Sequence, residues 1–236
     1  MYYDMHSHIL PEIDDGSKSV EMSLEIIEKL RAQNVKNICF TPHFYTNEES
    51  LERFVERRQE SLEKLLPHIP EDVSICVGAE VYVTRYLFNN KDISQVCYGD
   101  SKYILCEFPF SSSFSEHTMD YFNRLRGNYG LSPVLTHIER YDNLMANEDL
   151  VLDLVDEDII IQTNVGAFKH FSERRRLLKY IKRGYIDILG TDCHNLTRGN
   201  PDEYSKTVDL IRDKCGQETI DSFMETSAEI FTPYKK

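Results

Sequence analysis

Short apolar runs rich in β-branched residues alternate along this chain with stretches of helical periodicity. Strands are predicted at residues 2–5, 35–41, 73–78, 102–106, 133–136, 159–163 and 186–190. Apolar side chains at Met22, Ile26 and Leu30 share one face of a predicted helix, for which Ser19 is a plausible N-cap. Further helices are predicted around residues 51–66, 177–181, 201–214 and 218–230.

Strands that alternate with helices predict parallel βαβ units, because parallel neighbours need a crossover connection. Seven such units favour closure into an α/β barrel, and an open, doubly wound parallel sheet is the alternative. No linker rich in Pro, Gly or Ser interrupts the pattern, so we expect one domain over residues 1–236. The last two helical stretches are compatible with closure of the barrel or with a contact in a homo-oligomer.

Charge and composition argue against several classes of protein. Lys and Arg total 27 against 40 Asp and Glu, and the net charge of −13 disfavours a nucleic-acid binder or a polybasic membrane-surface protein. No apolar run approaches the roughly 20 residues that span a bilayer, and the first residues lack the pattern of a signal peptide. The six cysteines show no C-x-x-C spacing. We therefore expect free thiols in a cytoplasmic protein without direct membrane insertion.

Polar side chains stand where most of the predicted strands end. Six of the seven runs lead into potential metal ligands, which are His6, His8, His43, Glu80, Glu107, His137, Asp192 and His194. In an α/β barrel the carboxyl ends of the strands converge on one face, so we expect these side chains to meet there. His68, His117 and His170 lie outside the pattern and are expected at the surface.

Imidazole and carboxylate ligands together suit Zn, Fe or Mn, and their number exceeds what one ion needs. The pattern therefore predicts a multinuclear centre, of the kind that lowers the pKa of a bridging water and clamps a phosphoryl group. Arg140 and Arg198 follow His137 and His194 by three and four residues, in loops beside the ligands. Because Arg donates bidentately to phosphate oxygens, both are candidates for substrate binding.

Other kinds of phosphate chemistry lack their motifs in this chain. None of the six cysteines is followed six positions later by the Arg that a cysteine-dependent phosphatase needs. Neither G-x-x-x-x-G-K-[ST] nor G-x-G-x-x-G occurs, so no nucleotide-binding loop is predicted. The G-x-S-x-G nucleophile elbow is also absent from the sequence.

The motifs HSHILPEIDDG, TPHFY, GAEVYV, CEFPF, THIERY and GTDCHN stand in the order found in the PHP (polymerase and histidinol phosphatase) superfamily. Within it the chain most resembles the bacterial manganese-dependent protein-tyrosine phosphatases that are encoded with capsule and exopolysaccharide genes. The resemblance extends over about residues 1–200. It implies the PHP fold, a distorted (β/α)7 barrel, with about three divalent ions. The implied metal is Mn²⁺, with Fe, Zn or Mg as alternatives.

Carried over by position, the resemblance also implies a set of metal ligands. They are His6, His8, Asp15, His43, Glu80, Glu107, His137, Asp192 and His194. Asp15 joins the set only through the resemblance, since Asp14 and Asp15 before Gly16 by themselves are typical of a turn.

The reaction implied is hydrolysis of phosphotyrosine by metal-activated hydroxide. Arg140, with Arg198 as a second candidate, would bind the phosphate, and one of His43, His137 or His194 would assist the leaving phenolate. A strong general acid is not essential, because the phenol has a pKa of about 10. The implied partner is the phosphotyrosine tail of a cognate bacterial tyrosine kinase that regulates polysaccharide assembly.

The chain departs from the family pattern at two places. The family usually reads H-P-E-R-Y, whereas this chain has Ile138 in place of the Pro, so we expect a less rigid loop around Arg140. The family's Arg after D-x-H stands just before Pro. Here Arg198 is followed by Gly199 and Asn200 before Pro201, so its register differs.

Three other functions deserve comparison. The first is a phosphatase of the same superfamily that acts on a small ester such as histidinol phosphate. The second is an amidohydrolase-type metal enzyme, which fits Glu80, Glu107 and the D-x-H ending poorly. The third is a catalytically silent module that binds a kinase tail, and it would be marked by lost ligands.

Overall fold

Each of the seven predicted runs forms a strand in the computed structural model, which describes residues 1–235. The strands are β1 (Tyr2–Asp4), β2 (Val35–Phe40), β3 (His43–Tyr45), β4 (Ser74–Val77), β5 (Glu80–Tyr82), β6 (Tyr103–Glu107), β7 (Ser132–Leu135), β8 (Ile160–Asn164) and β9 (Ile188–Gly190). They pair in parallel, in the orders β1-β2-β4 and β3-β5-β6-β7-β8-β9.

The two sheets are parts of one barrel, because β2 continues into β3 and β4 continues into β5 after short interruptions. Pro42, which has no N–H to donate, lies in the first interruption. The barrel closes between its last and first strands, where Met5 N donates to Leu189 O (3.1 Å) and Ser7 pairs in parallel with Cys193. The predicted barrel is therefore confirmed, and the open doubly wound sheet is wrong.

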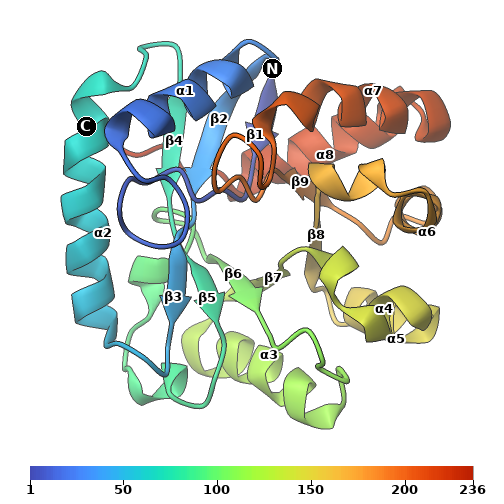
Figure 1. Ribbon diagram of the computed structural model, residues 1–236. Helices are drawn as coiled ribbons and strands as arrows, with labels where there is room; N and C mark the ends of the chain where they lie inside the picture. The colour runs from blue at the N-terminus through green and yellow to red at the C-terminus, as the bar shows by residue number, and fades with distance from the viewer. Residues whose placement is uncertain (236) are drawn as a thin grey trace.

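Helices surround the strands (Figure 1). They are α1 (Val20–Arg31), α2 (Leu51–Leu65), α3 (Glu116–Tyr129), α4 (Asp142–Ala146), α5 (Glu148–Asp156), α6 (Phe171–Lys182), α7 (Tyr204–Cys215) and α8 (Gln217–Ile230). In Figure 1, α1 and α2 lie on the left, α3 lies below, and α4 to α8 lie on the right. The predicted cap is confirmed, since Ser19 Oγ accepts a hydrogen bond from Met22 N (3.3 Å). Of the helices that the structure describes, none combines the length and apolar character needed to cross a membrane.

Two layers of buried apolar side chains hold the fold together. The outer layer packs the helices against the strands. The inner layer fills the barrel with strand residues such as Met5, Leu105 and Val134. Ile230 and Phe231, at the end of α8, belong to this inner layer. The last helix therefore contributes to closing the barrel core, which periodicity alone did not decide.

Two details of the strand prediction change. His43 and Glu80 begin the short strands β3 and β5, instead of following the ends of β2 and β4. The side-chain expectations are confirmed: all six cysteines are free, and His68, His117 and His170 are exposed.

Candidate metal centre

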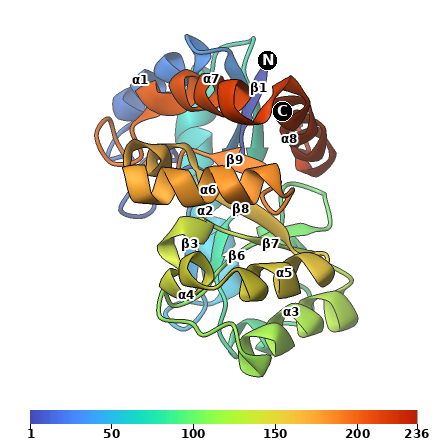
Figure 2. The same cartoon turned by 90° about the vertical axis from the view of Figure 1, so that its right-hand side faces the viewer.

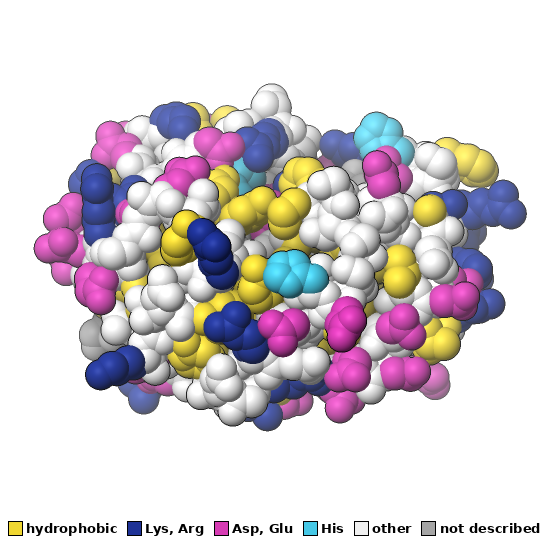
Figure 3. All heavy atoms as spheres, turned by 90° about the horizontal axis from the view of Figure 1, so that it is seen from below, with side chains coloured by type: hydrophobic (Ala, Val, Ile, Leu, Met, Phe, Trp, Pro, Cys, Tyr) yellow, Lys and Arg dark blue, Asp and Glu magenta, His cyan; other side chains and the backbone are white. Residues whose placement is uncertain are grey.

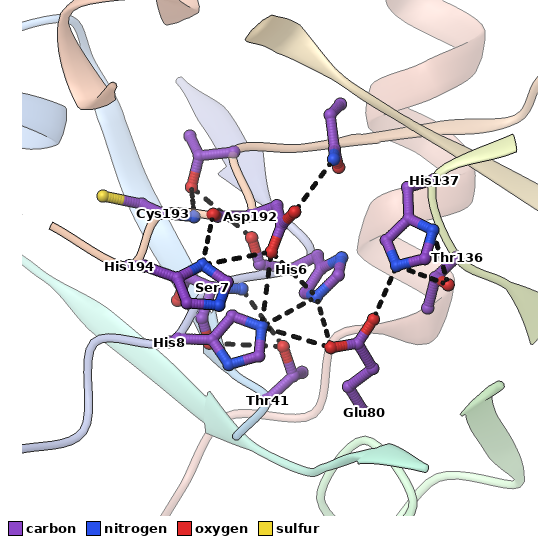
Figure 4. Close-up of polar contacts among 12 residues, drawn as sticks. His6, Ser7, His8, Thr41, Glu80, Thr136, His137, Asp192, Cys193 and His194 are labelled. Carbon is purple, nitrogen blue, oxygen red and sulfur yellow. Dashed lines mark hydrogen bonds and ion pairs between the residues drawn. The ribbon is translucent and has the colours of Figure 1, made fainter. Parts of the chain in front are cut away.

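The strands bring the predicted ligands together at the carboxyl end of the barrel (Figure 4). His6 and His8 follow β1, His43 and Glu80 begin β3 and β5, Glu107 ends β6, His137 follows β7, and Asp192 and His194 follow β9. All eight are buried, with no more than 8% of any of them exposed. The sequence thus located a cluster whose members are far apart along the chain.

Glu80 lies at the middle of this cluster. Its Oε2 atom is 3.3 Å from His6 Nε2, 3.2 Å from His8 Nε2 and 2.8 Å from His43 Nδ1. Its Oε1 atom is 2.8 Å from His137 Nε2. With both oxygens facing imidazoles, the Glu80 carboxylate would help to hold divalent ions in this cluster.

Asp192, which follows β9, also has a carboxylate oxygen that faces two histidines. Its Oδ1 atom is 3.3 Å from His8 Nε2 and 3.4 Å from His194 Nδ1. Its Oδ2 atom accepts hydrogen bonds from the Arg140 guanidinium and from Asn164 Nδ2 (3.1 Å). One oxygen is therefore oriented toward the histidines while the other is held by neutral and cationic donors.

Seven of the nine expected ligands form three overlapping groups, and the donor atoms of each group lie within 4.8 Å of one another, whereas His137 and Asp192 belong to none of the groups. The groups are His8, Asp15, His43 and His194; His6, His8 and Glu80; and His43, Glu80 and Glu107. Of the six buried side-chain atoms that make no hydrogen bond with any residue from 1 to 235, four belong to this cluster, and they are Glu80 Oε2, His43 Nδ1, Asp192 Oδ1 and His194 Nε2. Buried polar atoms normally find partners, so these orphaned lone pairs and this donor set fit divalent cations.

The electrostatics of the cluster support the same conclusion. Burial and the neighbouring Glu80 carboxylate raise the pKa of Glu107 to about 8. Burial and the nearby His8 imidazole lower the pKa of His194 to about 4. Burial opposes ionisation of Glu80, but His6 and His43 hold the pKa of Glu80 well below its usual range. Carboxylates that are buried and close to one another are stabilised in their ionised form by cations between them.

Asp14 is a site residue that the ligand pattern did not single out. Its Oδ2 atom accepts from His8 Nδ1 (2.7 Å) and from His43 N (3.0 Å), and its Oδ1 atom accepts from Gly16 N (2.8 Å). The predicted turn is present, and the Asp14 side chain inside it orients one ligand. Asp15 points instead to the cluster's edge, 3.3 Å from His194 Nε2, and is 53% exposed.

β8, the strand without ligands, supplies residues that position them. Gln162 Oε1 accepts from His137 N (2.6 Å), and Asn164 donates to Asp192. The partly buried Glu139 carboxylate accepts from Thr163 Oγ1 (2.8 Å). A signal was available in the sequence, because Gln162 and Asn164 stand two positions apart in a predicted strand and therefore face the same side.

A pocket of about 510 Å³ opens over the cluster. Asp15, His43 and Glu107 line its floor together with Arg140 and Arg198. Both predicted arginines therefore lie beside the ligands. Arg140 pairs with Asp192, and Arg198, which is half-exposed, pairs with Asp15.

Aromatic side chains form the rest of this pocket. Tyr45, Tyr82, Phe108 and Phe110 line it, and the Arg140 guanidinium lies 5.8 Å from the centre of the Phe110 ring. Phe110 is 47% exposed, so its ring is accessible to a ligand that enters the pocket.

The loop that carries Arg140 is anchored although it lacks the family's Pro. Residues Ile138–Arg140 form a short 3-10 turn in which Arg140 N donates to His137 O (2.9 Å). Ile138 is fully buried. Packing of the apolar side chain thus supplies order that a proline ring would otherwise supply.

A parallel barrel with a buried His, Asp and Glu cluster beneath an arginine-lined pocket is the arrangement of a metal-dependent hydrolase. The family model "Capsular polysaccharide synthesis, CpsB/CapC" matches residues 2–231. The chain belongs to the CpsB/CapC family, and the predicted family is confirmed.

Known proteins resemble this chain over most of its length. Tyrosine-protein phosphatase CpsB of Streptococcus pneumoniae is 32% identical over 228 residues, which is 90% of each protein. Tyrosine-protein phosphatase YwqE of Bacillus subtilis is 29% identical over 84% of this chain and 79% of its own. A solved structure from the pair YwqE and CpsB, described as metal-dependent tyrosine phosphatases, has a TM-score of 0.81 at 22% identity and covers 100% of both chains. This last likeness confirms the barrel fold.

Proposed function

We propose that this protein is a metal-dependent tyrosine-protein phosphatase. The observation that carries the proposal is the buried ligand cluster directly beneath a pocket lined by Arg140, Arg198 and aromatic side chains. Its family membership and its similarity to tyrosine-protein phosphatases support the same activity. None of the nine expected ligands is replaced by another residue type, which disfavours a silent binding module.

The nine residues expected as ligands would hold about three divalent ions, since seven of them form three overlapping groups and the other two, His137 and Asp192, lie beside Glu80 and His8. We favour Mn²⁺, with Fe, Zn or Mg as alternatives, because imidazole and carboxylate donors suit these metals. Such ions would supply Lewis acidity that favours deprotonation of a water nucleophile and offsets charge on the phosphoryl group.

Arg140 and Arg198 would bind the equatorial phosphate oxygens. Each guanidinium lies at the pocket floor and already pairs with a carboxylate, Asp192 for Arg140 and Asp15 for Arg198. A phosphate can take the place of a carboxylate on a guanidinium because both accept paired N–H donors. Arg140, with 30% of its side chain exposed, is oriented by the buried Asp192 and is our stronger candidate.

The aromatic wall favours an aryl phosphate over a small alkyl ester. Tyr45, Tyr82 and Phe110 line the pocket that opens over the cluster. The phenyl ring of phosphotyrosine is larger and less polar than the imidazole ring of histidinol phosphate, so it would gain more from burial against this wall. One of the buried histidines, His43, His137 or His194, would assist departure of the phenolate.

For the protein substrate we propose the phosphotyrosine tail of a cognate tyrosine kinase in capsule or exopolysaccharide synthesis. Membership of a capsular polysaccharide synthesis family supports this context. The six free thiols suit a reducing compartment, and we therefore place the enzyme in the cytoplasm.

The test is hydrolysis of a phosphotyrosine peptide by chelator-stripped protein, before and after Mn²⁺, Fe²⁺, Zn²⁺ or Mg²⁺ is restored. We expect activity that returns with Mn²⁺ and resists thiol alkylation. His137→Ala should lose both turnover and bound metal, whereas His117→Ala, which changes an exposed histidine on α3, should lose neither. Activity on histidinol phosphate alone would move the substrate to the small-ester alternative. Absence of activity on both, with metal bound, would refute the proposed function.

A further inference from the structure

A basic groove lies between α6 and α7 on a protein of net charge −13. Its volume is about 710 Å³, and it is lined by six Lys and Arg side chains and by three apolar ones, Phe171, Leu178 and Leu210. Phe171 is 72% exposed at its edge. We call this feature the α6–α7 groove.

The cations of the α6–α7 groove are only partly neutralised by the protein itself. Lys179 and Arg183 both pair with a single carboxylate, Glu148. Arg175 and Lys182 form no ion pair with any residue from 1 to 235. The groove therefore combines an apolar floor with unpaired positive charge, and it should bind a surface that is acidic around an apolar centre.

The neighbouring helix α5 carries such a surface. Asp149, Leu152, Asp153 and Asp156 are exposed and stand at i, i+3, i+4 and i+7, so they share one face of the helix. Leu152 is 40% exposed in the middle of these carboxylates. We call this feature the α5 acidic face.

Both features lie on the same side of the molecule, where α5, α6 and α7 face the viewer in Figure 2. Figure 3, which shows the molecule from below, has Asp and Glu side chains gathered at the lower right and Lys and Arg side chains at the right-hand edge, so acidic and basic side chains are segregated on that face as well. Within one chain α5 reaches the groove only through Glu148, at its start, which pairs with Lys179 and Arg183. Asp149, Asp153 and Asp156 form no ion pair with any residue from 1 to 235, so they and the unpaired groove cations can pair between two chains.

We propose that the α6–α7 groove of one molecule binds the α5 acidic face of a second copy of this chain. Leu152 would enter the groove against Leu178 and Leu210, and the flanking aspartates would pair with Arg175 and Lys182. Burial of the apolar side chains would stabilise the contact, and the charges would fix its register and select the partner. Each molecule carries both halves, so the contact builds a homo-oligomer.

The test is sedimentation velocity of the metal-loaded protein over a wide range of concentrations, with charge-reversal variants. Arg175→Glu with Lys182→Glu, and separately Asp153→Lys with Asp156→Lys, should each raise the dissociation constant by about tenfold or more. The four changes in one chain restore opposite charges across the contact and should return the dissociation constant toward that of the unaltered protein. Circular dichroism checks that each variant is folded.

The control makes the same change of net charge elsewhere, with Arg53→Glu and Lys64→Glu at exposed positions of α2. It should leave association unchanged. The proposal would be overturned if the unaltered protein were monomeric at every concentration. It would also be overturned if the variant with all four changes associated as weakly as the two double variants. A third contrary result would be that Arg175→Glu with Lys182→Glu leaves self-association unchanged but weakens binding of an acidic phosphopeptide. The groove would then be a binding site for the substrate.

Discussion

At the scale of single residues, the geometry of the centre depends on side chains that are not ligands themselves. Asp14 is the plainest case, because one carboxylate fixes the ring of His8, the backbone of His43 and the turn at Gly16. Burial opposes ionisation, yet the His8 imidazole and the Gly16 N–H hold the pKa of Asp14 below its usual range. A histidine whose Nδ1 is bound to a carboxylate presents Nε2 to a metal in a fixed orientation.

We expect Asp14→Asn to weaken metal binding by about 10–100-fold, because an amide cannot accept as strongly from the imidazole. Competition with a fluorescent chelator would measure the change. Glu12→Gln is the matched control, since Glu12 lies in the same loop and, among residues 1–235, forms an ion pair only with the exposed Lys64. Equal metal affinity of the two variants would show that Asp14 does not orient His8.

At the scale of elements, the loop after β9 is held in place by a close approach of backbone. Gly199 has φ +67°, and a Cβ atom there would lie 2.1 Å from the carbonyl oxygen of Asp192. His194 N and Asn195 N both donate to Arg198 O, which folds the loop back on itself. The position of two expected ligands therefore depends on the absence of a side chain at Gly199.

We expect Gly199→Ala to lower turnover at least about tenfold, because the clash must displace Asp192 or His194 from the geometry that catalysis requires. Gly130→Ala is the control, since Gly130 has the same φ of +67° at the end of α3 and nothing within 4 Å of its Cβ position. That variant should lose only about 1 kcal/mol of the free energy of unfolding and keep its turnover. Steady-state kinetics and urea unfolding of both variants would decide, and equal losses of turnover would contradict the argument.

At the scale of the whole molecule, the centre contains residues from both the first and the last strand of the barrel. His6 and His8 follow the first strand, Asp192 and His194 follow the last, and the strands between them contribute the remaining barrel ligands. Ions held by side chains from all around the barrel bind the folded chain and not the unfolded one. Metal binding is therefore expected to stabilise the closed barrel.

We expect saturating Mn²⁺ to raise the melting temperature of the stripped protein. At a hundred times the dissociation constant each bound ion adds about 2.7 kcal/mol, or roughly 5–10 °C for a domain of this size. Calorimetry with and without chelator would measure the shift. In Asp192→Ala the shift should shrink, and an unchanged melting temperature on metal loading of the unaltered protein would argue against a shared centre.

The sequence by itself determined the order of the seven main strands, the barrel and the His, Asp and Glu side chains that gather at the strand ends, whereas α3, α4 and α5 were not predicted. This was possible because hydrophobic periodicity is local, and parallel βαβ order forces the carboxyl ends of the strands to one face. It also determined the family, through motifs from HSHILPEIDDG to GTDCHN.

Only the tertiary structure decided the central position of Glu80, the different roles of Asp14 and Asp15, and the contribution of Gln162 from the strand without ligands. It also revealed the basic groove between α6 and α7. These features are distances between side chains that lie far apart in the chain. Local periodicity carries no information about such distances, since they are set by how the strands close and how the helices pack.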